Sequence, residues 1–255
     1  MLLNVLRAEW SKLTSTKSFW WTTALFFVFT LVWAWLVTTA TSLFEGAPAI
    51  ADAAALVSGL QWLNLSVLMI QAIMVVTTEY RYNLQVPVYL ATPKREVVAA
   101  AKLLLYAVVA AVIMLVGLAA ALLLAGLLAD EIHGGYTTLF SDPAAQRALW
   151  AFPLGTALLV LFSQGLALLL RQSAGSIAVG LILFWGIDTM VQLIPKIGSD
   201  AVHFSPFYAL RGWLGDIPAA DGPLEGNVWG YLFVFMGWGL ALWILGVVSL
   251  VKRDA

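Results

Sequence analysis

The stretch LLLYAVVAAVIMLVGLAAALLLAGLL, residues 103–128, contains no charged residue and no proline. An α-helix needs about 20 predominantly apolar residues to cross the hydrocarbon core of a bilayer, so this stretch predicts a membrane-spanning helix. Its surplus length predicts that the helix is tilted or extends into water.

Further apolar runs of similar length lie before and after this stretch. Together they predict six spans, at about residues 19–40, 56–77, 99–128, 149–170, 174–194 and 228–250. The composition agrees, because the chain is 62% hydrophobic and 11% charged, whereas soluble domains are about 45–50% apolar and about 25% charged. We therefore predict an all-α, polytopic membrane protein whose residues 19–255 form one six-helix transmembrane domain.

The basic residues predict the orientation, because loops rich in Lys and Arg stay in the cytosol. Six spans place ten basic residues on the side of the N-terminus: Arg7, Lys12, Lys17, Arg81, Lys94, Arg95, Lys102, Arg171, Lys252 and Arg253. The opposite side holds three: Arg147, Lys196 and Arg211. Both termini are therefore expected in the cytosol.

Two segments outside the spans have apolar faces of their own. Residues 1–18 carry Leu2, Leu6, Trp10 and Leu13 at helical spacing, which predicts an amphipathic helix along the inner leaflet; an irregular leader is the alternative. The outer segment, residues 195–227, combines prolines with many aromatic residues. We expect short re-entrant helices there, because an apolar segment of this kind is unfavourable in water.

Signatures of several functional classes are absent from the sequence. It contains no cysteine, no GxxxxGK phosphate-binding loop, no HExxH and no GxSxG. No basic cluster with interleaved aromatics indicates nucleic-acid binding. Asp130, Glu131 and His133 are a weak metal-site candidate, for which a solvated loop is the ordinary interpretation. We predict neither a catalytic nor a cofactor nor a metal site.

Polar residues inside spans are unfavourable and need a reason. Gln61, Asn64 and Gln71 share one face of the second span, while Asp188 and Gln192 lie one turn apart in the fifth. Hydrogen bonds between helices and a role in lining a translocation path are equally good explanations. The sequence leaves both open.

The only sizeable internal cytosolic loop is expected at residues 78–97. Glu79, Tyr80, Arg81, Lys94 and Arg95 lie around its apolar middle, which suits a docking element for a soluble partner; a simple solvated loop is the alternative. Pro87 and Pro93 argue against one continuous helix in this loop.

Three blocks in this region resemble the ABC-2 type permeases, especially small actinobacterial ones: Thr77-Thr78-Glu79-Tyr80-Arg81, Leu90-Ala91-Thr92-Pro93-Lys94-Arg95 and Ala101-Lys102-Leu103. The N-terminal Arg7-Ala8-Glu9-Trp10-Ser11-Lys12-Leu13 is similar to the leader of that family, and His203-Phe204-Ser205-Pro206-Phe207 to its outer segment.

The resemblance implies the membrane subunit of an exporter in a bacterial plasma membrane. Its expected partners are separate ABC ATPase subunits, which bind ATP and magnesium, and a second permease, identical or related, together with membrane lipids. The resemblance also implies that Glu79, Tyr80, Arg81, Lys94 and Arg95 engage the ATPase, and that the second and fifth spans face a central cavity. The chain itself would be non-catalytic, and its few polar wall residues suit an amphipathic, drug-like or lipid-like cargo.

Two other classes remain open at this stage. An ATP-independent secondary transporter or channel predicts an internal repeat or a matched pair of broken spans, neither of which is clear. An intramembrane enzyme or a structural membrane protein predicts converging acids or histidines at one depth, whereas Asp188 stands alone in its span.

Overall fold

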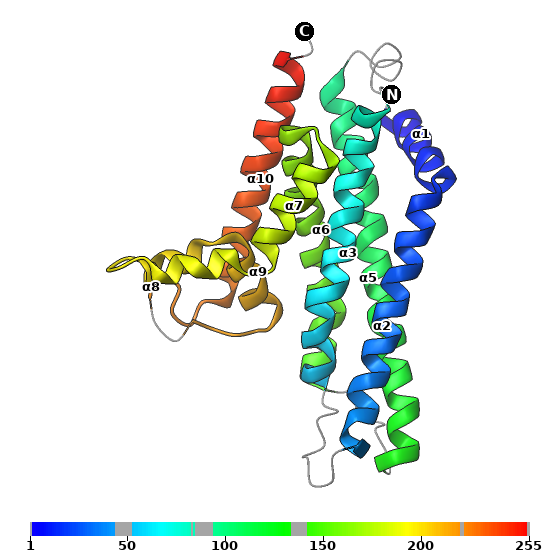
Figure 1. The fold of residues 1–255 in the computed structure, drawn as a ribbon, viewed down its shortest axis with the longest axis vertical. Coiled ribbons are helices and arrows are strands. Elements are labelled where there is room, and N and C mark those ends of the chain that lie inside the picture. Colours follow the sequence, from blue (N-terminus) through cyan, green and yellow to red (C-terminus); the bar gives the residue numbers. More distant parts are fainter. Residues whose placement is uncertain are drawn as a thin grey trace.

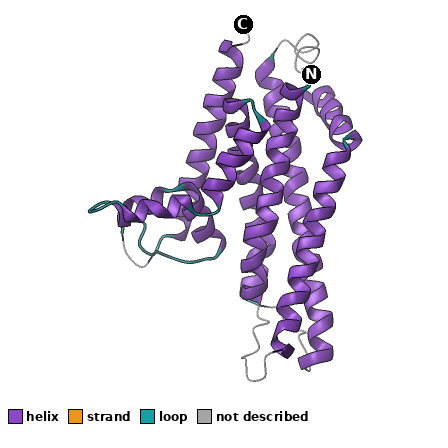
Figure 2. Ribbon diagram, in the orientation of Figure 1, coloured by secondary structure: helices purple, strands orange, loops and turns teal. Residues whose placement is uncertain are grey.

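The computed structural model describes residues 2–43, 53–82, 84, 94–133, 142–219 and 222–253, and these parts are almost entirely helical (Figure 2). In chain order the elements are α1 (Leu2–Ser15), α2 (Lys17–Leu43), α3 (Ala53–Arg81), α5 (Arg95–His133), α6 (Pro143–Leu170), α7 (Ser173–Phe184), the 3₁₀ helix η1 (Ile187–Leu193), α8 (Gly198–Ala201), the 3₁₀ helix η2 (Val202–Phe204), α9 (Pro206–Leu214) and α10 (Val228–Arg253). The all-α prediction is confirmed for the described residues.

Five of the helices, α2, α3, α5, α6 and α10, are long and apolar enough to cross a membrane. The shortest of them, α10, has 26 residues and measures about 39 Å at 1.5 Å per residue. The hydrocarbon core of a bilayer is about 30 Å thick. The prediction of a multi-pass helical membrane protein is therefore confirmed at the level of these five helices.

The expected span at residues 174–194 differs from the prediction, because it is not one continuous helix. Helix α7 ends at Phe184, and Gly186 follows with a φ of 113°, outside the right-handed helical region. The twelve residues of α7 reach about 18 Å, less than the thickness of the hydrocarbon core. A sixth crossing therefore needs the residues beyond α7, and it stays a prediction.

Helix α6 forms the centre of the bundle and packs against α3, α5 and α10. Helices α6 and α10 approach closely at Gly165, where a built Cβ atom would lie 2.6 Å from the backbone nitrogen of Trp243. Glycine is thus required at this crossing, as is common where membrane helices approach closely. Helices α2 and α10 instead expose many large apolar side chains, which suits contact with lipid.

The beginning of α1 and the end of α10 lie at the same end of the molecule (Figure 1). Helices α8 and α9 lie to one side of the long helices, across their direction. Phe207, Leu210 and Trp213 of α9 are buried, and α9 packs against α10. Residues 195–227 thus contain short helices packed against the bundle, while their re-entry into the membrane stays a prediction.

Candidate functional site

Four charged side chains meet where α1, α3 and α5 come together, and we call them the ion cluster: Glu9, Lys12, Glu79 and Lys102. Lys102 Nζ lies 2.7 Å from Glu9 Oε2 and 2.8 Å from Glu79 Oε1. Lys12 Nζ lies 2.6 Å from Glu9 Oε1 and 3.0 Å from the same Glu79 oxygen. Each lysine therefore bridges both carboxylates.

Burial differs among the members of the ion cluster. The side chains of Glu9 and Lys102 are 5% and 8% exposed, whereas that of Lys12 is 41% exposed. A buried charge is tolerated when an opposite charge and hydrogen bonds compensate its lost hydration. Two carboxylates and two ammonium groups fulfil this condition, so the ion cluster is neutral and joins three helices.

Local sequence brings these groups to one place. Glu9 and Lys12 are three residues apart and therefore lie on the same side of α1. At the junction with α2, the Phe19 amide donates to Thr16 O and the Trp20 ring donates to Thr14 O. These bonds fix α1 beside the bundle, with Glu9 facing Lys102.

A second set of contacts ties the same end of the bundle to α6, α7 and α10. The Arg171 guanidinium lies 5.5 Å from the ring centre of Tyr80 and donates to Ser249 O at 3.0 Å. The Ser173 hydroxyl donates to Thr77 Oγ1 at 2.8 Å. The last turns of α3 are thus held by charged and polar contacts from both sides.

The predicted coupling residues fall into two groups. Glu79, Tyr80 and Arg81 belong to the last turn of α3 and not to a loop, because the helix continues to Arg81. Arg81 is exposed and lies over the Tyr82 ring at 5.6 Å. Glu79, expected in the cytosolic loop, is buried in the ion cluster.

The other coupling residues lie where the chain re-enters the bundle. Lys94 is exposed just before α5, and Arg95, its first residue, donates to Leu250 O at 3.4 Å. Residue 83 and residues 85–93 lie outside the described residues, so the middle of the predicted loop has no structural account.

Glu9 and Lys102 were not predicted as site residues. Each carried a signal, since Glu9 interrupts the otherwise apolar side of α1 and Lys102 lies inside an apolar run. Their pairing depends on how α1 packs against α3 and α5, which sequence spacing does not specify.

Two of the predicted path residues join helices. Asn64 donates to Thr30 of α2. Gln71 donates to Phe19 O and to Thr23 Oγ1, both at 3.1 Å, and accepts from the Tyr106 hydroxyl at 2.8 Å. For Asn64 and Gln71, hydrogen bonding between helices accounts for the polar side chain.

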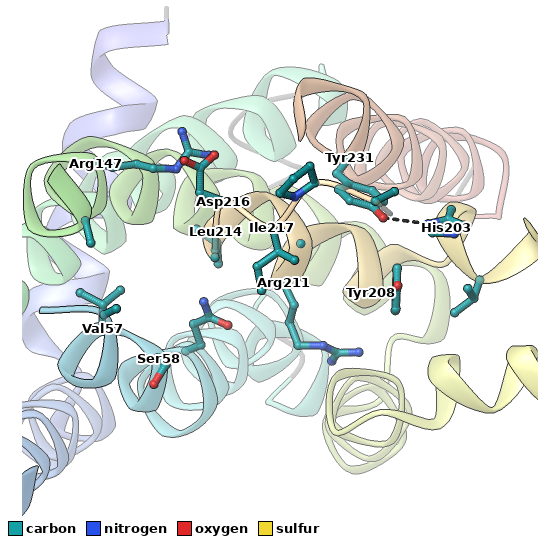
Figure 3. A pocket seen from close by; sticks show the side chains of 18 of the residues that line it. Val57, Ser58, Arg147, His203, Tyr208, Arg211, Leu214, Asp216, Ile217 and Tyr231 are labelled. Atoms are coloured by element: carbon teal, nitrogen blue, oxygen red, sulfur yellow. Dashed lines mark hydrogen bonds and ion pairs between the residues drawn. The ribbon is translucent and has the colours of Figure 1, made fainter. Parts of the chain in front are cut away.

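Gln61 and Gln192 instead line a cavity of about 1110 Å³ between α3, α6 and the outer segment (Figure 3). Asp188 belongs to η1, but its side chain lies outside the described part of the chain. A smaller cavity of about 230 Å³ adjoins the ion cluster and reaches Gln71. The predicted path residues are therefore divided between two places.

Among the described residues, no three His, Asp or Glu side chains gather in a way that could hold a metal ion. The side chains of Asp130, Glu131 and His133 lie outside the described part.

Comparison with known proteins adds no relative from which a role could be assigned. No family model matches the chain, and no curated protein matches its sequence. The function is therefore argued from the two places described above, the ion cluster and the larger cavity.

Proposed function

We propose that this chain is the membrane subunit of an ATP-driven, ABC-2 type exporter that moves an amphipathic, drug-like or lipid-like cargo out of the cytosol. The observation that carries the proposal is the ion cluster, which joins α1, α3 and α5 directly beside the segment that resembles the ATPase-coupling loop. A force on that segment would reach three helices together.

The transmission follows from the contacts. Residues 82–94 connect the end of α3 to the beginning of α5, so a displacement of this segment acts on both helix ends. Glu79 and Lys102 couple the two ends to each other, and Glu9 and Lys12 extend the coupling to α1. ATP binding by the partner would then shift the population between inward-facing and outward-facing arrangements of the bundle.

The topology in this proposal has six crossings with both termini in the cytosol of a bacterium. The excess of basic residues on that side supports it. So does the location of the first and last helix ends at one end of the molecule (Figure 1).

The assembly in this proposal contains a second permease, identical or related, and two ABC ATPase subunits. ATP and magnesium bind to the ATPase subunits, and this chain carries no catalytic step.

Gentle purification and ATP turnover test the proposal. A Walker-motif ATPase should co-purify with the chain, and Arg81→Ala should reduce ATP turnover of the complex several-fold. Arg81 suits this test because its exposed side chain lies outside the ion cluster. Lys252→Ala is the matched control, since it removes an exposed cation at the same end of another helix.

An ATP-independent transporter is the second candidate, and the break at Gly186 favours it, because such transporters use interrupted helices. Reconstituted into vesicles without any ATPase, the chain would then move solute down an ion gradient. Transport by the chain alone would overturn the exporter proposal.

A further inference from the structure

The larger cavity combines apolar walls with two guanidinium groups. Val57 of α3, Leu214 of α9 and Ile217 supply apolar surface, while Arg147 of α6 and Arg211 of α9 enter from different sides (Figure 3). Its volume of about 1110 Å³ is at the upper end of the range of about 300–1000 Å³ typical of small-molecule sites. The cavity is therefore large enough for a molecule with an aliphatic chain and a polar head.

Arg147 has hydrogen-bonding capacity left over. Its Nη2 donates to Trp213 O at 2.8 Å and lies 3.1 Å from Asp216 Oδ1. Its Nε is buried and has no hydrogen-bond partner. The side chain is 19% exposed, and its guanidinium lies 5.3 Å and 6.0 Å from the ring centres of Trp150 and Trp213. An anion in the cavity can therefore reach Arg147 where Asp216 now contacts it.

Asp216 is the carboxylate that compensates Arg147, and it is held loosely. Its side chain is 55% exposed, and only one of its oxygens is within ion-pair distance. Exposed ion pairs contribute about 0–1 kcal/mol, so another anion competes with this carboxylate at little cost. Asp216 is thus an exchangeable counter-ion at the cavity.

Arg211 adds positive charge, but its guanidinium already bonds to other parts of the fold. Its Nη1 donates to Phe184 O at 2.8 Å, at the end of α7, and its guanidinium lies 5.3 Å from the Trp62 ring centre. Two guanidiniums against the one carboxylate of Asp216 leave the described lining with an excess of positive charge. The cavity therefore favours an anion over a cation.

The depth of the cavity suits an amphiphile. Gln61 at its wall precedes Glu79 of the ion cluster by 18 positions in the same helix, which corresponds to about 27 Å. The cavity and the ion cluster are thus separated by nearly the thickness of the hydrocarbon core. A head group at Arg147 would lie near the far interface, with its chain against apolar walls.

We infer that this cavity binds an anionic amphiphile, whose phosphate or carboxylate takes the place of the Asp216 carboxylate on Arg147 while its aliphatic chain lies along Val57 and Leu214. The inference concerns binding by the chain alone and does not depend on an ATPase. A failed binding test would therefore leave the exporter proposal untouched, and the reverse also holds.

Native mass spectrometry of the chain in dodecyl maltoside, a neutral detergent, tests it with dodecyl phosphate as the probe. Dodecyl phosphate should bind at one site, and dodecyltrimethylammonium should not compete. Arg147→Gln should weaken binding at least about tenfold, the effect of 1.4 kcal/mol. Asp216→Asn should strengthen binding several-fold, because it removes the competing carboxylate.

Two further variants guard against loss of folding as an explanation. Ser58→Trp places a large side chain into the cavity from an exposed position of α3 and should abolish binding. Lys196→Gln removes an exposed cation of the outer segment that does not line the cavity, and it should change nothing.

Three outcomes would overturn the inference. They are unchanged binding in the Asp216→Asn variant, equal binding of the cationic detergent, and displacement of dodecyl phosphate by millimolar inorganic phosphate, which would indicate a site for free anions.

Discussion

Lys102 and Lys12 contact the same two carboxylates, yet their substitution should have very different consequences. Lys102→Met leaves two buried carboxylates with one partly exposed partner, and breaking a buried ion pair typically costs about 3–5 kcal/mol. Lys12→Met removes a lysine that is 41% exposed and should cost at most about 1 kcal/mol. Thermal unfolding of the two variants in detergent measures the difference.

A double-mutant cycle provides the control for this prediction. Adding Glu9→Gln to Lys102→Met removes the orphaned charge, so the second substitution should recover part of the lost stability. Equal losses for Lys102→Met and Lys12→Met would contradict the view that burial makes the ion cluster stabilising.

The pH dependence of Lys12 gives a second prediction at this scale. Burial lowers the pKa of Lys12, but the hydrogen bond to Glu9 and the charge of Glu79 outweigh burial and raise the pKa above its ordinary value of 10.5. A raised pKa means that the folded state favours the charged form, so this contribution is complete below pH 10.5 and disappears as pH rises through the raised pKa.

The wild-type chain should therefore be more stable than Lys12→Met by a constant amount between about pH 6 and about pH 9, and the advantage should vanish at higher pH. Unfolding of both proteins across this range provides the measurement. An advantage that instead grew with alkaline pH would show that Lys12 is not held in its charged form.

Single residues also show why the site was only partly predictable. The sequence placed Glu79 in the loop that follows the second span, whereas it belongs to the last turn of α3, and its burial depends on α1 lying against α3 and α5. The sequence also placed Gln61, Asn64 and Gln71 on one face of the span. Asn64 and Gln71 both bond to α2 while Gln61 lines the larger cavity, and these surroundings follow only from the packing.

At the scale of helices, the crossing of α6 and α10 gives a third prediction. Gly165→Ala places a methyl group 2.6 Å from the backbone of Trp243, which cannot move aside as a flexible side chain would. Overpacking of this kind costs about 1–3 kcal/mol, so the variant should unfold at a lower temperature.

Gly237→Ala is the matched control, because it changes the same residue type in α10 where nothing lies within 4 Å of the new Cβ atom. This variant should be at least as stable as the wild type, since alanine favours helix more than glycine does. If the two variants unfolded at the same temperature, that result would contradict the close packing of α6 against α10 at Gly165.

Helix α7 shows where the hydropathy pattern fails to predict the end of a helix. Residues 174–194 are apolar throughout most of their length, so the pattern predicts one span, and a single glycine at 186 is not a strong signal against it. The break involves a tertiary contact, because Arg211 of α9 donates to Phe184 O at the end of α7. Long, uniformly apolar runs were predictable, but an interruption stabilised from another helix was not.

At the scale of the whole molecule, the chain between α6 and α10 passes from one end of the bundle to the other, although α7 is short. Arg171, just after α6, contacts Ser249 near the end of α10, while Trp150 of α6 stacks on Trp229 at the start of α10. Since 21 residues separate Trp150 from Arg171 in sequence, these two levels lie about 30 Å apart. The chain between α6 and α10 therefore travels about the thickness of a hydrocarbon core, as a sixth crossing requires.

This passage leads to a prediction of topology that cysteine labelling can test without background, because the chain has no cysteine of its own. Six crossings with cytosolic termini place Ser11 of α1 inside the cell and Ser199 of α8 outside, and both positions are exposed. A membrane-impermeant maleimide should therefore modify Ser199→Cys in intact cells, and Ser11→Cys only after lysis. If both cysteines reacted in intact cells, the chain between them would cross the membrane an even number of times. At least one of α2, α3, α5, α6 or the passage between α6 and α10 would then not cross the bilayer, and the N-terminus would lie outside the cell, so the topology of the exporter proposal would be wrong.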